Sequence, residues 1–167
     1  MEVLKEIPVG GRTVVELCTL LARYGHSVDR LAGSIIEEDV PTTLPVSRNV
    51  AFVQLCVGDL GCTKPPTTRE LVELISSSRF GSRVLGEAAL HLRLAIPQQR
   101  NEDGPMYMPC ILHRPGGLPA FLVLSPGIYN HLPAAIYGLF AGHERSWSLN
   151  TKLILTARNY ACNGAPS

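Results

Sequence analysis

The apolar positions of residues 13–38 recur at helical spacing in two successive stretches. The first begins with Thr13 and Glu16, whose spacing is that of a capping box, and ends at Gly25, which favours a left-handed helix stop. The second follows Ser27, a residue type that commonly caps helix N-termini. The pattern therefore predicts two helices that pack together as a hairpin.

A different pattern follows over residues 49–80. Residues 49–57 are almost all apolar, as in a strand covered on both faces, whereas residues 40–48 contain two prolines and suit an extended connector. Thr67 and Glu70 repeat the capping-box spacing ahead of another stripe of apolar residues. This segment is predicted to form a strand, a loop and a third helix.

Beyond the third helix the apolar period changes to two. Leu90, Leu92 and Leu94 alternate with His91 and Arg93. Successive side chains of a strand point to opposite faces of a sheet. The alternation therefore predicts a half-exposed strand, with the three leucines buried and with His91 and Arg93 in solvent.

Short apolar segments separated by glycine and proline turns continue through the rest of the chain. They predict four further strands, over residues 106–112, 120–124, 136–140 and 152–157. Residues 86–158 are therefore predicted to be the β-rich part of a single domain that spans residues 1–167. The fold class that follows is α+β, with the helical hairpin and the third helix packed on a mixed, largely antiparallel sheet.

The composition suits one soluble domain. Of the 167 residues, 46% are hydrophobic, and the formal net charge of +1 gives no field that would attract nucleic acid or an anionic membrane. The five cysteines are an odd number, and three lie in apolar stretches, a pattern typical of reduced thiols. The first residues lack the pattern of a secretory signal, and no apolar run is long enough to cross a bilayer. A cytoplasmic protein is expected, with neither nucleic acid nor a membrane as its partner.

Motifs for catalysis and metal binding are sparse. Cys56 and Cys62 stand apart without a histidine or a second pair at zinc-ligand spacing, so no metal or cofactor is expected. The Gly-x-Ser-x-Gly elbow of a serine hydrolase does not occur. A small hydrolase or transferase that uses a histidine with an arginine or a carboxylate stays open as an alternative. Its candidate residues are His91, His113 or His143, together with Arg93 or Glu144.

Residues 127–149 combine aromatic rings with small polar groups. Such a mixture is typical of recognition surfaces, because large amphipathic rings provide contact area at little entropic cost. The candidate ligand-binding residues are Tyr129, Asn130, His131, Tyr137, His143, Arg145 and Trp147. Trp147 is predicted to be partly exposed, since an indole rarely becomes fully buried. The favoured function is a non-enzymatic module that binds a protein or a small molecule; the alternative is that these aromatic residues fill a small core.

Three stretches, residues 13–38, 50–74 and 86–98, resemble a group of uncharacterised bacterial proteins from metagenomic and candidate-phylum genomes. They occur in the same order, so the resemblance covers most of the domain. It implies a shared fold and no particular activity. The ending, in which Trp147 precedes a last strand, looks like that of the same group and is similar to the variable surfaces of proteins diversified by retroelements. A retroelement-diversified ligand-binding protein is therefore a further alternative.

Overall fold

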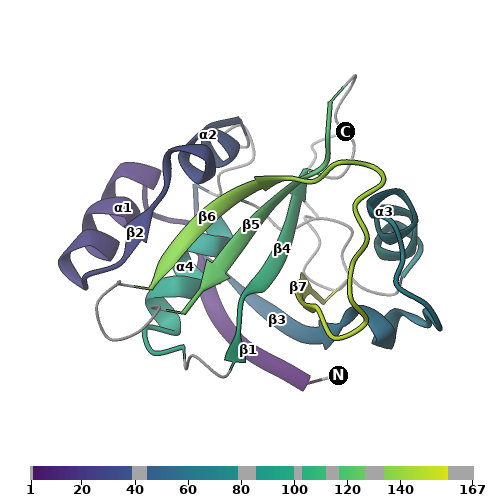
Figure 1. The fold of residues 1–167 in the computed structure, drawn as a ribbon. Coiled ribbons are helices and arrows are strands. Elements are labelled where there is room, and N and C mark those ends of the chain that lie inside the picture. The colour runs from purple at the N-terminus through teal and green to yellow at the C-terminus, as the bar shows by residue number, and fades with distance from the viewer. Residues whose placement is uncertain are drawn as a thin grey trace, which may run out of the picture.

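The computed structural model describes residues 2–38, 45–78, 86–99, 103–111, 117–126 and 134–157 (Figure 1). Its helices are α1 (Val14–Arg23), α2 (Arg30–Glu38), α3 (Thr68–Ser77) and α4 (Gly86–Ala95), with a short 3-10 helix, η2 (Val57–Leu60). Its strands are β1 (Glu2–Val9), β2 (Ser27–Val28), β3 (Arg48–Cys56), β4 (Met106–Ile111), β5 (Ala120–Ser125), β6 (Ala135–Phe140) and β7 (Lys152–Thr156). None of the helices in these ranges has the length and apolar character needed to cross a bilayer.

The strands form one mixed sheet of seven strands, in the order β1-β3-β7-β4-β5-β6-β2. The pairs β4–β7 and β2–β6 are parallel, and the other neighbours are antiparallel. The predicted α+β class is therefore confirmed, as are the strands predicted near β3, β4, β5, β6 and β7. The first strand, β1, was not predicted from the sequence, although it pairs with β3 along most of its length.

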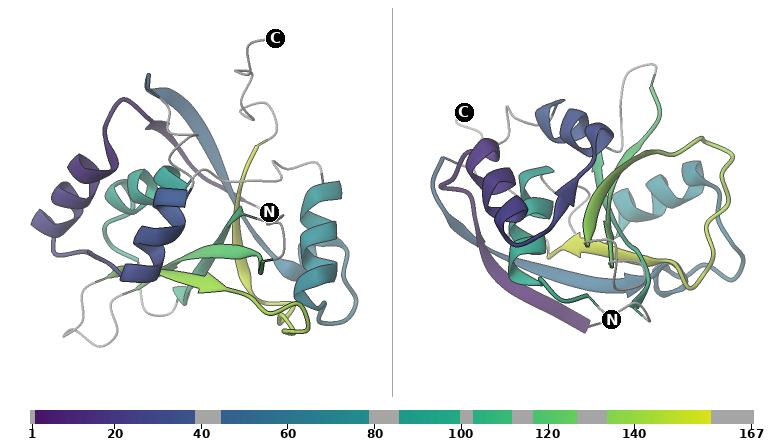
Figure 2. Two further views of the ribbon diagram at one scale, coloured as in Figure 1. Left: turned by 90° about the horizontal axis from the view of Figure 1, so that it is seen from above. Right: turned by 60° about the vertical axis from the view of Figure 1, so that its left-hand side comes forward.

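Helices cover both faces of the sheet, with α1, α2 and α4 on one side and α3 on the other (Figure 2). Alternation along β5 shows the division: Leu122 and Leu124 lie in the core beneath α1, α2 and α4, whereas Phe121 lies in the core beneath α3. The same alternation separates Ile154 from Leu153 on β7. The sheet therefore holds two hydrophobic cores, one on each face.

The predicted hairpin of α1 and α2 is not confirmed. The short strand β2 lies between the two helices and pairs with β6, and α1 packs mainly against α4 while α2 packs mainly against β6. Ser27 lies in β2 and does not cap α2. Asp29 has that role, because its Oδ1 accepts hydrogen bonds from the backbone N–H groups of Ala32 (2.6 Å) and Gly138 (3.0 Å). One carboxylate thereby fastens the start of α2 to β6.

The strand predicted around Leu92 is wrong, since this segment forms helix α4. The helix is buried on almost all sides, so its sequence shows no 3.6-residue apolar period, and the alternation of leucines does not report a strand. Leu90 and Leu92 are fully buried, as predicted, and Leu94 is half-buried. Arg93, predicted to lie in solvent, is fully buried, and His91 is half-buried.

Both predicted capping boxes are present. At α1 the Thr13 hydroxyl accepts from the Glu16 N–H, and the Glu16 carboxylate accepts from the Thr13 N–H at 2.7 Å. Thr67 and Glu70 repeat these contacts at α3. The hydrogen bonds to each carboxylate lower the pKa values of Glu16 and Glu70 below their usual range. The third helix therefore begins where the sequence predicts.

Candidate functional site

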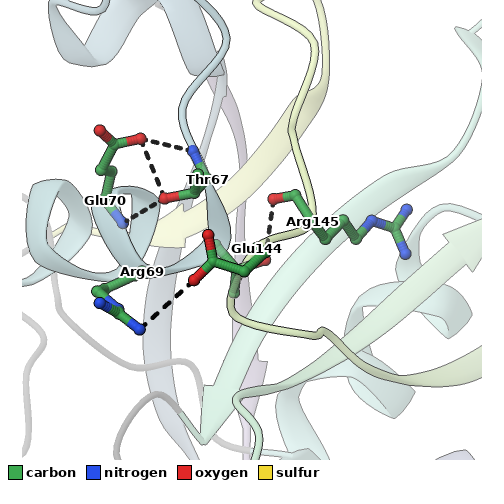
Figure 3. A network of polar contacts seen from close by, with 6 residues as sticks. Thr67, Arg69, Glu70, Glu144 and Arg145 are labelled. Atoms are coloured by element: carbon green, nitrogen blue, oxygen red, sulfur yellow. Dashed lines mark hydrogen bonds and ion pairs between the residues drawn. The ribbon is translucent and has the colours of Figure 1, made fainter.

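The segment that joins β6 to β7 passes the N-terminal end of α3 (Figure 3). Its residues 142–146 are all exposed and mostly polar, and they are bounded by two buried residues, Ala141 and Trp147. We call residues 142–146 the presenting loop. It contains two of the residues predicted to bind a ligand, His143 and Arg145.

Backbone hydrogen bonds fix the presenting loop to α3. The first N–H groups of a helix have no partner within the helix, and here the loop supplies their acceptors. The Thr68 N–H donates to the Arg145 carbonyl at 2.9 Å, and the Arg69 N–H donates to the His143 carbonyl at 3.3 Å. Within the loop, the Arg145 N–H donates to the Gly142 carbonyl at 3.0 Å. The loop backbone is therefore held from both sides, while its side chains face solvent.

Trp147 is the buried support of this loop. Its ring is only 2% exposed, and its indole N–H donates to Thr68 Oγ1 at 2.9 Å. The ring packs edge-on against Tyr107 and tilted against Phe121, with centroid distances of 5.2 and 5.0 Å. The predicted partial exposure of Trp147 is therefore wrong, because Tyr107, Phe121 and Arg145 pack against its ring and α3 satisfies its polar atom. In addition to the indole bond, the backbone N–H of Trp147 donates to the Pro66 carbonyl at 2.9 Å.

Arg145 and Glu144 are the charged side chains of the presenting loop. The Arg145 guanidinium carbon lies 4.8 Å from the centroid of the Trp147 ring, a distance at which a cation is attracted to the aromatic face. The Glu144 carboxylate lies 3.5 Å from Arg69 Nη2 (Figure 3), with both side chains largely exposed. An exposed pair of this kind contributes little to stability. The loop thus exposes two charged groups: the Arg145 guanidinium, which packs on the buried Trp147 ring, and the Glu144 carboxylate, which is weakly paired with Arg69.

The other residues predicted to bind a ligand do not lie in the presenting loop. Tyr137 is 40% exposed on β6 and shares a sheet row with Val123 and Tyr107, so two strand spacings, about 10 Å, separate it from Tyr107 beside Trp147. Tyr129, Asn130 and His131 lie outside the described residues.

The residues of the alternative enzyme site are not brought together. His91 Nε2 accepts from the Gly10 N–H at 3.1 Å, and burial, with a smaller effect of the Arg12 charge, lowers the pKa of this imidazole. Arg93 lies inside the other core, and Glu144 pairs with Arg69 on the surface. His113 lies outside the described residues. Among the described candidates, no histidine contacts Arg93 or Glu144 through a hydrogen bond.

An open groove of about 470 Å³ runs beside α3. It is lined in part by Cys62, Lys64, Glu70 and Glu73, and no histidine is among the described residues of its lining. The thiol of Cys62 therefore has no imidazole base there to activate it. Within the ranges given above, no three His, Cys, Asp or Glu side chains gather closely enough to hold a metal ion.

Sequence reasoning missed a second polar cluster, inside the core between α4 and the sheet. Arg93 is fully buried, and its Nη2 donates to Gln99 Oε1 (2.9 Å) and to the carbonyls of Ser125 (3.0 Å) and Ala135 (3.4 Å). His26, which precedes β2, lies close enough for the Arg93 charge to lower its pKa, although burial is the larger cause. Residues 87–92 include strong helix formers, and this composition could have indicated a helix around Arg93. It gives no indication that the arginine is buried.

The described residues form two separate polar features, the presenting loop and the Arg93 cluster. The presenting loop and the Arg93 cluster lie on different sides of the sheet and share no residue. Comparison with protein-family models, with curated proteins and with solved structures gives no match.

Proposed function

We propose that this chain is a non-enzymatic binding module that presents residues 142–146 to another protein. The observation that supports this most is the combination of exposed side chains with a fixed backbone. Every residue of the presenting loop is exposed, yet its carbonyls cap α3 and its end is held by the buried Trp147. A surface segment that is ordered before binding loses little conformational entropy when a partner docks.

The chemistry of the loop favours a partner with acidic side chains. Arg145 is the exposed cation of the presenting loop, and its position is defined because it rests on the ring of Trp147. Arginine is enriched at the energetic centres of protein interfaces, where it pairs with carboxylates through a planar fork of donors. His143 adds a hydrogen-bonding ring two residues away. Glu144 is already paired with Arg69, so it leaves Arg145 as the dominant charge.

The shape of this surface favours a macromolecular partner over a small molecule. Small ligands bind in concave sites that enclose most of their surface. His143, Glu144 and Arg145 are exposed, and none of them lines the groove beside α3. A protein surface needs no enclosing pocket, and Tyr137 extends the same side of the sheet as a further contact. Tyr129, Asn130 and His131 stay predicted members of this surface.

A selection from a displayed library of random peptides tests the proposal with the purified chain as bait. The selected peptides are expected to be rich in Asp and Glu, and Arg145→Ala is expected to weaken their binding at least tenfold, the effect of losing an interface anchor. The matched control is Arg23→Ala, which removes an exposed arginine of the last turn of α1. Peptides that bind Arg145→Ala and the wild type equally well, or a selection without acidic enrichment, would overturn the proposal.

A further inference from the structure

The groove of about 470 Å³ beside α3 lies between two walls. One wall is a stripe of α3 in which Glu70, Glu73, Leu74 and Ser77 recur at the spacing of a single helix face. The other wall comes from the segment of residues 61–66, which leads from η2 to the N-cap of α3. From Glu70 to Ser77 the helix rises about 10 Å, which is the length of about three residues of an extended chain.

The stripe lies on the side of α3 that faces away from the sheet. Leu71 and Ile75 of the same helix are fully buried in the core beneath it. Leu74, in contrast, is half-buried and is not among the described residues of either core. Together with Pro66 it gives the groove an apolar surface. Covering this surface with apolar atoms of a partner removes it from water and is favourable.

Glu73 supplies the excess charge of the groove. Among the described residues of the lining, the charged side chains are Lys64, Glu70 and Glu73, so the carboxylates outnumber the cations. The Glu70 carboxylate is already engaged in the capping box, where it accepts from the N–H and the hydroxyl of Thr67 at 2.7 and 3.0 Å. The Glu73 carboxylate makes no hydrogen bond or ion pair with any residue in the described ranges. An unpaired carboxylate next to an apolar side chain suits a group that is both apolar and cationic.

The groove and the presenting loop meet at Thr67. This residue follows Pro66 of the groove and forms an antiparallel bridge with Ser146 of the presenting loop. Figure 3 shows Glu70 of the groove and Arg145 of the loop on either side of Thr67. A partner segment that crosses Thr67 therefore reaches both features.

We propose that the groove binds a lysine or arginine side chain of the same protein partner whose acidic residues pair with Arg145; this inference rests on the proposed function and adds a second contact to it. The aliphatic stem of such a side chain covers Leu74, and its cationic head pairs with the Glu73 carboxylate. A wholly apolar side chain would desolvate that carboxylate without pairing it, and an acidic one would face two carboxylates. The open groove does not enclose a small molecule, whereas a side chain of a docked protein needs no enclosure.

Peptide-display selections with three baits test this contact: the wild type, Glu73→Gln and Glu37→Gln. Glu73→Gln removes the excess charge of the groove at nearly constant shape. Glu37→Gln does the same at an exposed glutamate of α2, on the other face of the sheet. Peptides selected on the wild type and on Glu37→Gln are expected to carry both an acidic residue and a Lys or Arg. On Glu73→Gln the acidic enrichment is expected to remain and the basic enrichment to disappear.

The outcomes separate the groove contact from the proposed function. Acidic peptides without basic enrichment on the wild type would overturn the groove contact and leave the role of the presenting loop in place. Basic enrichment that persists on Glu73→Gln would do the same. Peptides without acidic enrichment would overturn the proposed function and, with it, this second contact.

The thiol of Cys62 reports on occupancy of the groove, because this half-buried residue lies in its lining. A saturating concentration of a peptide selected on the wild type is expected to slow the alkylation of Cys62 by iodoacetamide several-fold, as followed by mass spectrometry. Cys18 is the internal control, since it is also half-buried but lies in α1, on the other face of the sheet. Its alkylation is expected to stay unchanged. Equal alkylation rates of Cys62 with and without the peptide would overturn the groove contact, as would equal protection of Cys18.

Discussion

The indole N–H of Trp147 donates to Thr68 Oγ1 at 2.9 Å, which joins the segment after β6 to the first turn of α3. The Thr68 hydroxyl in turn donates to the Arg145 carbonyl at 3.3 Å, and the Thr68 N–H donates to the same carbonyl. A buried aromatic side chain and a helix N-terminus thus satisfy each other's polar groups. The stability of the core under α3 and the geometry of the exposed loop are therefore linked through one threonine.

Trp147→Ala should destabilise the fold by about 3–5 kcal/mol, because it leaves a large cavity between α3 and the sheet. The measurement is urea unfolding followed by far-UV circular dichroism. Tyr137→Ala is the matched control, since it removes a substantially exposed aromatic ring from the same face of the sheet, and should cost well below half as much. An unfolding midpoint unchanged by Trp147→Ala would show that the ring is not part of the core.

Thr68→Val keeps the shape of the side chain but removes its hydroxyl. The indole N–H then has no acceptor in a buried site, which costs about 1–3 kcal/mol. Thr68→Ser retains the hydroxyl and should recover the polar part of this loss. The two variants are compared by urea unfolding, and a loss in Thr68→Ser with none in Thr68→Val would mean that the methyl group, and not the hydrogen bond, carries the effect.

Gly138→Ala should weaken the docking of α2 on β6. A Cβ atom at Gly138 would lie 2.6 Å from the backbone nitrogen of Ala32 and 2.6 Å from the carbonyl carbon of Leu31, so the helix would have to move. Overpacking of this kind costs about 1–3 kcal/mol or more. Gly33→Ala in α2 is the opposite case, because no atom other than those of its chain neighbours and of the nearby backbone of the same helix lies within 4 Å of its Cβ position. It should stabilise the chain by about 0.5–1 kcal/mol through helix propensity, and a destabilised Gly33→Ala would contradict the position of α2.

Acidification should destabilise the fold below about pH 6.5, the ordinary pKa of histidine. The folded-state pKa of His91 is lowered, so the unfolded chain binds the proton more readily, and the stabilisation present above pH 6.5 is lost as the pH falls toward the folded value. His26 acts in the same direction. Urea unfolding at pH 7.5, 6.5 and 5.5 measures the effect, and His91→Gln should flatten the profile. A profile equally steep in that variant would exclude His91 as its source.

The accuracy of the sequence predictions follows the distance over which each signal acts. The capping boxes of Thr13 and Thr67 depend on contacts within one helical turn, and both are correct. The position of Ser27 misled because the residues after α1 form β2, whose pairing with β6 is a long-range contact. The sequence does not reveal the strand β1, because its partners in β3 lie about forty to fifty residues away and its apolar alternation is broken by a register shift.

The burial of single side chains was the hardest property to predict. The leucine alternation predicts Arg93 in solvent because a period of two implies a half-exposed strand, whereas a helix buried on nearly all sides has no apolar period. The sequence predicts Trp147 at a rim because indoles need a polar partner, and it does not show that Thr68 provides one. His143 and Arg145 are exposed, as a binding role requires. Their exposure is easier to predict because the polar character of this segment is visible in the local sequence.

Amide hydrogen exchange across the presenting loop tests the central claim most directly, because recognition by this loop requires its backbone to be fixed before any partner binds. The account predicts that the backbone amides of Trp147 and Arg145 exchange about a thousandfold or more slowly than unstructured peptide, approaching the amide of Ile154 in β7. Exchange of both amides at rates near those of an unstructured peptide, with Ile154 still protected, would contradict it.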